Sequence, residues 1–229
     1  MPNKKHRPPE PRPAALSVAV DVVLLTPRDG SLAALLVRRG EEPFAGCLAL
    51  PGVLVGGDEP LEEAAARALR SKAGLSDVYL EQLYTFGAPG RDPRSRTVSV
   101  AYMALVAFDR IAAAGATGAL AALTVPWPGE TGGPVEAGAP LAFDHADILG
   151  LAVKRIRGKL EYAPIGYALL PPEFTLGDLQ RLHETVLGRK INKDSFRRRM
   201  LASGELEATG GQRTGVDYRP ATLYRRRKE

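Results

Sequence analysis

The sequence contains almost no cysteine. Cys47 is the single cysteine among 229 residues, so no disulfide can form within the chain. This excludes the class of small secreted proteins held together by disulfides, and it suits a reducing compartment, so we expect a cytoplasmic protein. The three histidines, His6, His145 and His183, are scattered without the spacing of a metal-ligand motif, and we expect no metal site.

Long hydrophobic runs are also absent. The apolar stretch 14–25 is interrupted by Ser17 and Asp21, and it is much shorter than the roughly 20 residues that a membrane-spanning helix needs. Residues 1–13 are basic and rich in proline, without the apolar core of a secretory signal. We expect these residues to form a disordered tail, and we expect no membrane partner.

Charge is unevenly distributed along the chain. The sequence has 31 Lys and Arg against 26 Asp and Glu, a net charge of +5. Residues 171–229 hold 13 of the basic and 8 of the acidic residues, whereas residues 14–170 hold 14 and 17. A neutral-to-acidic body with a basic C-terminal part indicates a polyanionic partner at one end. A merely solvated basic tail is the alternative.

The N-terminal half alternates strand and helix signals. Two β-type runs, 18–25 and 32–37, flank the turn Pro27-Arg28-Asp29-Gly30, which predicts a hairpin. Residues 59–73 have apolar side chains at helical spacing, acids at the start and bases toward the end, and Gly74 follows as a stop signal. The other expected elements are an apolar segment at 46–55 broken by Pro51-Gly52, strands at 78–86 and 98–108 joined by a polar loop at 88–96, and a helix at 146–160.

Residues 112–140 consist largely of alanine, glycine and proline, with two acidic residues and no basic ones. We interpret this segment as a loop or an insertion. Prolines at 164, 171 and 172 punctuate the chain after the helix expected at 146–160. They place a domain boundary near residue 170, so that we expect a tail at 1–13, a first domain at 14–165 and a second at 171–229.

The second domain follows the order helix, turn, basic helix, hairpin. Thr175 is a suitable N-cap for a helix that ends at Gly188, and Asn192 for a helix over 193–202. Two short strands, 206–209 and 221–225, then complete the order of a winged helix-turn-helix. In such a domain the second helix enters the major groove of DNA. A winged helix used for protein contact is the alternative.

Basic residues crowd this second helix and the expected wing. Arginine can bond both guanine edges and phosphates, and wing residues reach the backbone or the minor groove. The candidate DNA-binding residues are Lys190, Lys193, Ser195, Arg197, Arg198, Arg199, Arg213 and Arg219.

The stretch 50–59, followed by the helix ending at Gly74-Leu75, resembles the Nudix box, G-x5-E-x7-R-E-U-x-E-E-x-G-U, where U is a bulky apolar residue. In the register fixed by Gly74-Leu75, Glu59 and Arg67 match the first glutamate and the arginine of the box. Val53 stands where the opening glycine should be. The three glutamates of the R-E-U-x-E-E core are replaced by Ala68, Ser71 and Lys72.

These replacements bear directly on the chemistry that the Nudix resemblance implies. Positions 68, 71 and 72 share one helix face, where carboxylates in an active Nudix enzyme collect Mg²⁺. Alanine offers no oxygen, serine is a weak ligand, and lysine brings a positive charge to the metal's place, although it can pair directly with a phosphate. We therefore expect ligand binding without efficient hydrolysis, with no catalytic residue and no cofactor. An ordinary amphipathic helix of an unrelated α/β domain is the alternative.

A wider resemblance covers nearly everything from residue 16 to residue 227. The segments Arg38-Arg39-Gly40-Glu41-Glu42-Pro43-Phe44, Tyr84-Thr85-Phe86-Gly87 with Arg91-Asp92-Pro93-Arg94, and Phe196-Arg197-Arg198-Arg199 are similar to the NrtR family, the Nudix-related transcriptional regulators of NAD metabolism. Leu48 stands where the family pattern leads us to expect tryptophan.

The resemblance implies ADP-ribose as the effector. A diphosphate needs cationic partners, and an adenine needs an aromatic one. Adjacent strand residues point to opposite faces, so we expect only one of Arg38 and Arg39 to reach the pocket. For Arg67, the alternative to ligand binding is a structural role. The candidate ligand-binding residues are Arg38, Arg39, Phe44, Arg67, Lys72, Phe86, Arg91 and Arg94.

We therefore predict an α+β protein, a Nudix-like α/β/α sandwich with a mixed sheet followed by a winged helix-turn-helix domain. The resemblance implies a homodimeric repressor of NAD biosynthesis or salvage genes that binds a palindromic operator and senses ADP-ribose or a related metabolite. The main alternative is an active Nudix pyrophosphatase on ADP-ribose or NADH, with Glu59, Glu62 and Glu63 as its remaining metal ligands. A protein-interaction module is a third possibility.

Overall fold

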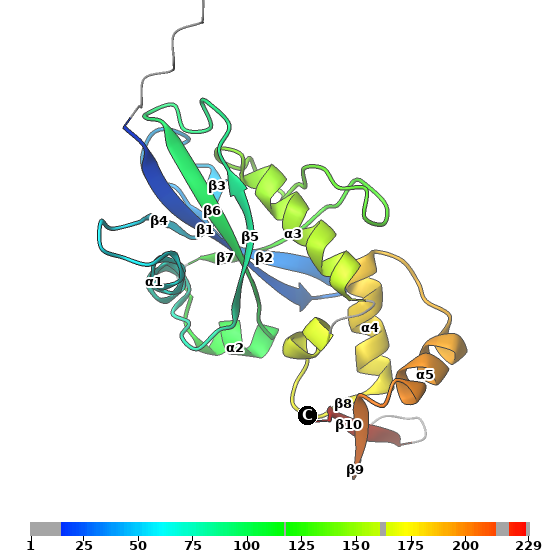
Figure 1. Cartoon of the computed structure of the whole chain (residues 1–229). Coiled ribbons are helices and arrows are strands. Elements are labelled where there is room, and N and C mark those ends of the chain that lie inside the picture. Colours follow the sequence, from blue (N-terminus) through cyan, green and yellow to red (C-terminus); the bar gives the residue numbers. More distant parts are fainter. Residues whose placement is uncertain (1–14, 117, 161–163, 214–219, 228–229) are drawn as a thin grey trace, which may run out of the picture.

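The computed structural model describes residues 15–116, 118–160, 164–213 and 220–227. These residues form a large mixed sheet with helices on both faces, followed by a smaller module of helices and strands (Figure 1). The predicted fold class is confirmed. No helix in the described ranges combines the length and the hydropathy needed to cross a bilayer. The predicted disordered tail at 1–13 lies outside the described residues.

The large sheet is organised around β1 (Ser17–Arg28). β1 forms the predicted hairpin with β2 (Ser31–Arg38) and pairs in parallel with β6 (Thr97–Leu105), which makes the sheet mixed. The described residues contribute seven strands, in the order β3-β2-β1-β6-β5, with β4 paired to β1 and β7 to β2. The remaining strands are β3 (Leu48–Ala49), β4 (Gly52–Leu54), β5 (Leu80–Phe86) and β7 (Ala119–Ala122).

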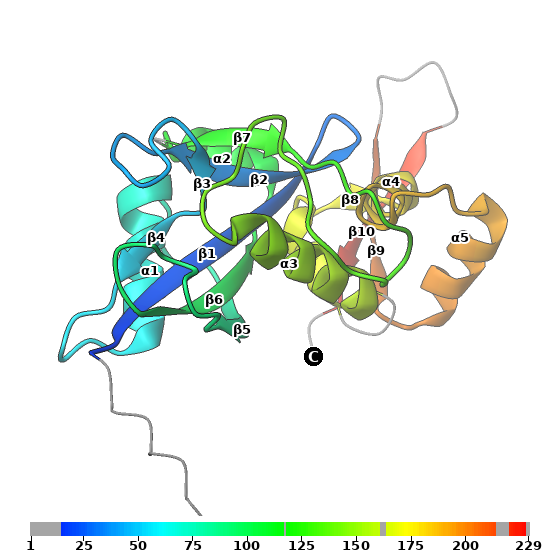
Figure 2. The same ribbon diagram turned by 90° about the horizontal axis from the view of Figure 1, so that it is seen from above.

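Both faces of β1 are buried, which explains its long apolar run. Val20, Val22 and Leu24 pack in the core on the side of α1 (Leu61–Ala73). Val23 and Leu25 belong to the core on the side of α3 (His145–Lys159). Figure 2 shows these two helices on opposite sides of β1. Because strand side chains alternate, Asp21 shares the face of Val23 and points toward the side that α3 covers.

Most of the described residues in 112–140 lie outside helices and strands, as the interpretation of a loop or insertion predicts, but part of the segment joins the sheet and the core. β7 adds a strand to the sheet beside β2, and Thr124 pairs with Glu136 in an isolated bridge. Trp127 and Val135 are buried in the core on the α3 side. The strand expected at 98–108 also ends earlier, at Leu105, because the short helix α2 (Phe108–Ala113) follows it. Pairing and burial against distant residues, rather than local composition, order this segment.

The C-terminal module, residues 174–227 as far as they are described, has the predicted winged-helix order. α4 (Leu176–Leu187) is capped by a reciprocal pair of hydrogen bonds between Thr175 and Asp178. Asn192 caps α5 (Lys193–Ala202) by accepting from the Ser195 N–H. Gly188 ends α4 in the left-handed conformation. The elements after α3 are η1 (Pro164–Leu169), β8 (Phe174–Thr175), α4 (Leu176–Leu187), α5 (Lys193–Ala202), β9 (Leu206–Arg213) and β10 (Ala221–Arg226), with the strand order β8-β10-β9.

Helix α4 belongs to two hydrophobic cores. Leu182 and Val186 are buried in the same cluster as Val23 of the large sheet and Ile156 of α3. One turn nearer the N-terminus of the same helix, Leu179 belongs with Phe196 of α5 to the small core of the C-terminal module. The helix that supports the C-terminal module is therefore also part of the main core.

Candidate functional site

A cavity of about 470 Å³ opens where β1, the end of β2 and the start of α3 meet. Its volume falls within the usual range for small-molecule sites. The predicted ligand-binding residues that line it are Arg38, Arg39, Lys72, Arg91 and Arg94. Four arginines and a lysine give the cavity the cationic character that a diphosphate ligand would need.

Both Arg38 and Arg39 line the cavity, which corrects the expectation that only one of them reaches it. β2 ends at Arg38, so the alternation of a strand does not extend to Arg39. The loop that follows holds both side chains by its backbone. Arg38 donates to the Gly46 carbonyl at 2.5 Å, and Arg39 Nε donates to the Pro43 carbonyl at 2.8 Å.

An aromatic ring that the sequence prediction missed, Phe143, lies close to two of these guanidinium groups. Arg39 lies 4.8 Å and Arg94 5.8 Å from its ring centroid, within cation–π range. Phe44 meets the same ring edge-on at 4.9 Å between centroids. Both phenylalanines have positive φ, 67° at Phe44 and 53° at Phe143, a conformation that is uncommon for bulky residues and that concentrates at functional sites.

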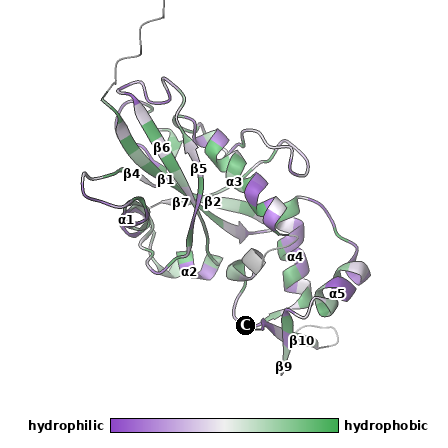
Figure 3. Cartoon of the chain, in the orientation of Figure 1, coloured by the Kyte–Doolittle hydropathy of each residue, from purple (hydrophilic) through white to green (hydrophobic). Residues whose placement is uncertain are grey.

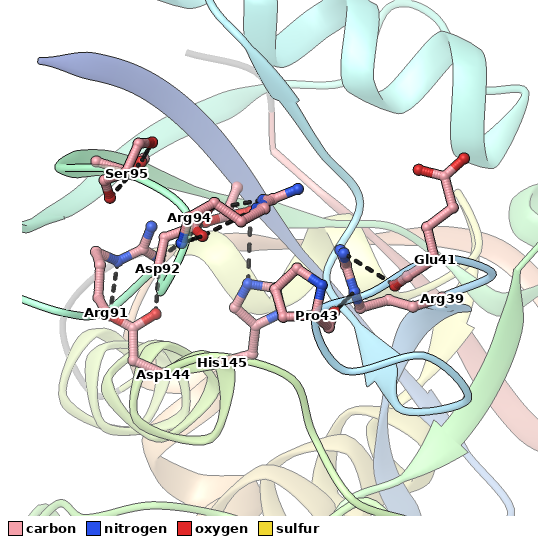
Figure 4. A network of polar contacts seen from close by, with 11 residues as sticks. Arg39, Glu41, Pro43, Arg91, Asp92, Arg94, Ser95, Asp144 and His145 are labelled. Carbon is pink, nitrogen blue, oxygen red and sulfur yellow. Dashed lines mark hydrogen bonds and ion pairs between the residues drawn. The ribbon is translucent and has the colours of Figure 1, made fainter.

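Arg91 is held by carboxylates on the floor of the cavity (Figure 4). Its side chain is 5% exposed, and the guanidinium makes two hydrogen bonds to Asp144, at 2.9 and 2.6 Å, and approaches Asp21 at 3.4 Å. Asp21 also accepts from the Ser99 hydroxyl at 2.6 Å. A Cβ at position 52 would clash with the Asp21 carboxylate, which explains Gly52. Arg91 therefore orders the floor, and its charge is largely compensated before any ligand arrives.

His145 completes this floor as a buried, neutral imidazole. Its Nδ1 accepts the Leu50 N–H at 3.0 Å, so the proton lies on Nε2, 3.7 Å from Asp21. Burial lowers the pKa of His145 below its ordinary value despite the two nearby carboxylates, Asp21 and Asp144. The side chain can thus offer an uncharged N–H donor to the cavity that it lines.

Three predicted ligand-binding residues are not among those that line the cavity. Phe44 lies at its rim, against Phe143. Phe86 packs instead against the core on the α3 side and meets Tyr84 edge-on. Arg67 makes a bidentate pair with Glu59, both bonds 2.7 Å, and this pairing lowers the pKa of Glu59 to about 2. Arg67 also donates to the Leu54 carbonyl, so it ties α1 to the preceding loop.

The helix α1 presents the three replaced positions in different settings. Ala68 is fully buried against the sheet, Ser71 is exposed, and Lys72 is exposed and lines the cavity. Within the described ranges, no group of three or more His, Cys, Asp or Glu residues is arranged to hold a metal ion.

A second candidate site is the exposed surface of α5. Phe196 is the buried residue of this helix, whereas Lys193, Ser195, Arg197, Arg198 and Arg199 are all exposed. In Figure 3, α5 is coloured largely as hydrophilic, whereas the strands of the large sheet are coloured largely as hydrophobic. The structure thus brings together the predicted DNA-binding residues of this helix on one rigid, basic element.

The other predicted DNA-binding residues are partly engaged within the protein. Lys190 pairs with Glu184 at 3.0 Å, and Arg213 pairs with Asp178 at 2.8 Å. Arg213 therefore ties the wing to the N-terminus of α4. Arg219 lies outside the described residues.

A buried histidine of α4 packs against α5. His183 of α4 meets the ring of Phe196 edge-on at 5.0 Å. Burial, together with the charge of Arg199, lowers the pKa of His183 to about 4. The histidine is therefore neutral near pH 7 and acts as a packing residue.

The missed residues of the cavity are Asp21, Asp92, Phe143, Asp144 and His145. Phe143-Asp144-His145 immediately precedes the expected start of α3, and an aspartate at that point is a recognisable helix-start signal. Asp21 had a stronger signal, since it is a lone acid inside an apolar strand. Only the packing of α3 on β1 reveals that these two signals belong to the same site.

Comparison with known proteins is consistent with this geometry. Family models described as the NUDIX domain and the NrtR DNA-binding winged helix domain match residues 15–127 and 166–226. The chain is 36% identical over 212 residues to the ADPR responsive transcriptional repressor NtrR of Acinetobacter baylyi, covering 91% of this chain and 81% of that protein.

Solved structures show the same arrangement. Shewanella oneidensis NrtR complexed with a 27mer DNA superposes with a TM-score of 0.72 at 36% identity, over 92% of this chain and 93% of that one. Shewanella oneidensis NrtR without DNA gives a TM-score of 0.74 at 36% identity, over 92% and 94% of the two chains. Over 87 residues the chain is also 36% identical to the ADP-ribose pyrophosphatase of Methanocaldococcus jannaschii, which is 38% of this chain and 49% of that enzyme.

Proposed function

The chain belongs to the NrtR family, and from this we propose that it is a transcriptional repressor that senses ADP-ribose and controls genes of NAD biosynthesis or salvage. In this proposal residues 14–165 form the ligand-binding part and residues 171–229 the DNA-binding part. The observation that carries the proposal is the presence, in one chain, of a cavity lined by arginines and an exposed basic helix in a winged-helix setting.

In the ligand cavity, ADP-ribose would be held mainly by Arg38, Arg39, Arg94 and Lys72. Their cationic groups suit a diphosphate, and Phe44 at the rim remains the candidate for contact with the adenine. Arg91 would act indirectly, by fixing Asp144 and Asp21 beneath the ligand. This division of roles follows the burial of Arg91 against two carboxylates. Arg94 also pairs with a carboxylate, that of Asp92, but its side chain is 55% exposed and so remains accessible to a ligand.

Helix α3 offers a physical connection between the two sites. It begins at His145 in the ligand cavity, and its last turns pack against α4 of the C-terminal module. Arg157 near its C-terminal end donates to the Val186 carbonyl of α4 at 2.9 Å. A ligand that displaces the start of α3 would therefore shift α4, and with it α5. In a homodimer on a palindromic operator, such a shift would misalign the two α5 helices with their half-sites.

We propose binding without hydrolysis. Ala68 and Ser71 cannot hold Mg²⁺ as carboxylates do, and Lys72 brings a cation to that position. Glu59, which could contribute a metal ligand, is engaged by Arg67 at 2.7 Å. The likeness to an ADP-ribose pyrophosphatase makes hydrolysis the second candidate function. Release of AMP from ADP-ribose with Mg²⁺ at turnover of about 1 per second or more would support the enzyme instead.

Fluorescence anisotropy with DNA from upstream of NAD genes tests the proposal. The chain should bind one labelled duplex tightly at moderate salt, and ADP-ribose should weaken that binding about tenfold or more. A matched control is Arg70→Ala, on α1 but outside the cavity lining, which should leave both quantities unchanged. Absence of binding even at low salt would contradict the DNA-binding role. Binding that is insensitive to ADP-ribose would contradict the sensor role alone.

A further inference from the structure

A second cavity, of about 500 Å³, lies at the junction of the large sheet and the C-terminal module. It is enclosed by the segment around Trp127, by the turn between β1 and β2, and by the C-terminal end of α4. None of the described residues that line it belongs to the first cavity. Its size also falls within the range of small-molecule sites.

Arg157 of α3 forms one wall of this second cavity. The residue is 5% exposed, and its guanidinium holds three segments together. Nε donates to the Val186 carbonyl at 2.9 Å, and Nη1 donates to the carbonyls of Trp127 at 3.1 Å and Gly129 at 2.9 Å. The guanidinium also lies 4.8 Å from the centroid of the Trp127 ring.

The charge of Arg157 is not neutralised by a carboxylate. Among the described residues, no acidic side chain lies within ion-pair distance of it, and the lining of the second cavity contains no Asp or Glu. Burial accordingly lowers the pKa of Arg157, with no opposing contribution from an acid. Arg91 in the first cavity is the reverse case, because two carboxylates accompany it. A buried cation without a counterion is costly, and proteins normally pair such charges.

One end of the guanidinium remains available. Nη2 of Arg157 has no hydrogen-bond partner among the described residues, and it lies beside Gly188, where an added Cβ would come within 3.1 Å. Gly188 lines the cavity together with the exposed Arg189, which supplies a second cation at the opening. Leu32, Leu123, Val125 and Pro126 make much of the remaining wall apolar.

From these observations we propose that the second cavity is a binding site for a small organic anion. A carboxylate or phosphate group would accept from Nη2 of Arg157 and from Arg189, and its apolar body would pack against Trp127 and the aliphatic wall. Charge-assisted hydrogen bonds to guanidinium groups are the strongest available in such a setting. The site is separate from the proposed ADP-ribose cavity and is independent of that assignment.

Trp127 makes the site directly observable. It is the single tryptophan of the chain, so the intrinsic tryptophan fluorescence reports this cavity alone. Sodium benzoate and phenyl phosphate serve as probes of the two anion types, titrated at constant ionic strength maintained with sodium chloride. We expect a saturable change in fluorescence with at least one probe, and the two titrations distinguish a carboxylate site from a phosphate site.

Two variants and a matched control decide the proposal. Arg157→Lys should weaken the probe about tenfold or more, and Arg189→Ala severalfold, since each loses a charge-assisted bond. Arg181→Ala, an exposed arginine elsewhere on α4, should leave the affinity unchanged. Arg189 is exposed, so its variant should fold even if Arg157→Lys does not.

Three results would overturn the proposal. The first is no saturable change with either probe up to ~20 mM, well beyond the affinity expected of a small ligand in a formed site. The second is an unchanged affinity in Arg189→Ala and Arg157→Lys. The third is the same fluorescence change with sodium chloride alone. A failure of ADP-ribose to bind the chain would not contradict the proposed anion site, because ADP-ribose is assigned to the other cavity.

Discussion

Lys72 stands where helix α1 meets the ligand cavity, at a position that carries a metal-binding glutamate in the Nudix box. Its charge distinguishes the two candidate functions. A cation here can pair with a diphosphate directly, whereas a carboxylate would repel it unless a metal intervened.

Lys72→Glu should therefore lower the affinity for ADP-ribose in the absence of metal by about tenfold or more, since a charge-assisted contact is replaced by a like-charge repulsion. Isothermal titration calorimetry measures the change. Lys72→Ala should have a smaller effect, and Arg70→Ala on the same helix none. Equal affinities for all four proteins would show that Lys72 does not contact the ligand.

His183 makes the stability of the protein depend on pH. In the folded protein the pKa of His183 is about 4, below the ordinary value of 6.5. Between these two pH values the unfolded chain therefore binds a proton at His183 that the folded chain does not bind. The contribution to stability is complete above pH 6.5 and is lost as the pH falls toward 4. His145 shifts in the same direction.

When the pH is lowered from 7 to 5, protonation of His183 in the unfolded chain should reduce the free energy of unfolding by about 2 kcal/mol. Urea unfolding at pH 7 and at pH 5 measures this change. His183→Leu removes the titrating group, so its stability should fall by less over the same interval. An identical loss in both proteins would mean that His183 titrates normally in the folded chain.

Residues of the cavity floor illustrate what local sequence could and could not reveal. The cationic residues at 38, 39 and 94 were predictable because they lie in recognisable segments. The pairing of Arg91 with Asp144 and Asp21 was not, because these residues are far apart in the sequence. Their contact depends on α3 lying across β1.

At the scale of elements, α5 concentrates three adjacent arginines on a helix of ten residues, with Phe196 as its anchor. Arg199 lies 5.7 Å from the Phe196 ring centroid, so part of its side chain covers the small core. Arg197 and Arg198 are exposed.

Replacing Arg197 or Arg198 by alanine should weaken DNA binding, because each loses a contact with a base edge or a phosphate. A phosphate contact should also reduce the slope of log affinity against log salt by about one. Anisotropy titrations at several salt concentrations measure both quantities, with Arg70→Ala as the control. Unchanged affinity in both variants would indicate that α5 is not the DNA-reading helix.

Helices and strands differed in how well they were predicted. α4 and α5 begin after the capping residues Thr175 and Asn192, and α1 and α4 end at Gly74 and Gly188, all visible in the sequence. The structure has these three helices within a few residues of the prediction. β7 was missed because its residues, Ala119–Ala122, have little strand preference of their own. Its order comes from pairing with β2, which is a long-range interaction.

At the scale of the whole molecule, one hydrophobic cluster contains residues of both the large sheet and the C-terminal module. Leu182 and Val186 of α4 are buried with residues of the large sheet and α3, and Arg157 adds a polar link at the same junction. The two parts are therefore mechanically connected, which the proposed communication between ligand and DNA requires.

This shared core predicts a single cooperative unfolding transition. Circular dichroism and the fluorescence of Trp127 should give the same midpoint in urea. Leu182→Ala should destabilise the whole chain by about 2–5 kcal/mol while keeping the transition single, and the exposed Leu201→Ala should have little effect. Two separate transitions would show instead that the C-terminal module unfolds independently.

The sequence by itself determined the class of the protein, because hydrophobic periodicity, capping residues and the charge imbalance are local properties. The order of the C-terminal elements indicated a basic winged helix, and the resemblance to the Nudix box implied a Nudix-like body that has lost three carboxylates from α1. Only the tertiary structure decided which side chains share a cavity, that Ala119–Ala122 add a strand to the sheet, and that α4 belongs to the main core. These features arise from contacts between residues distant in the chain, which no local pattern specifies.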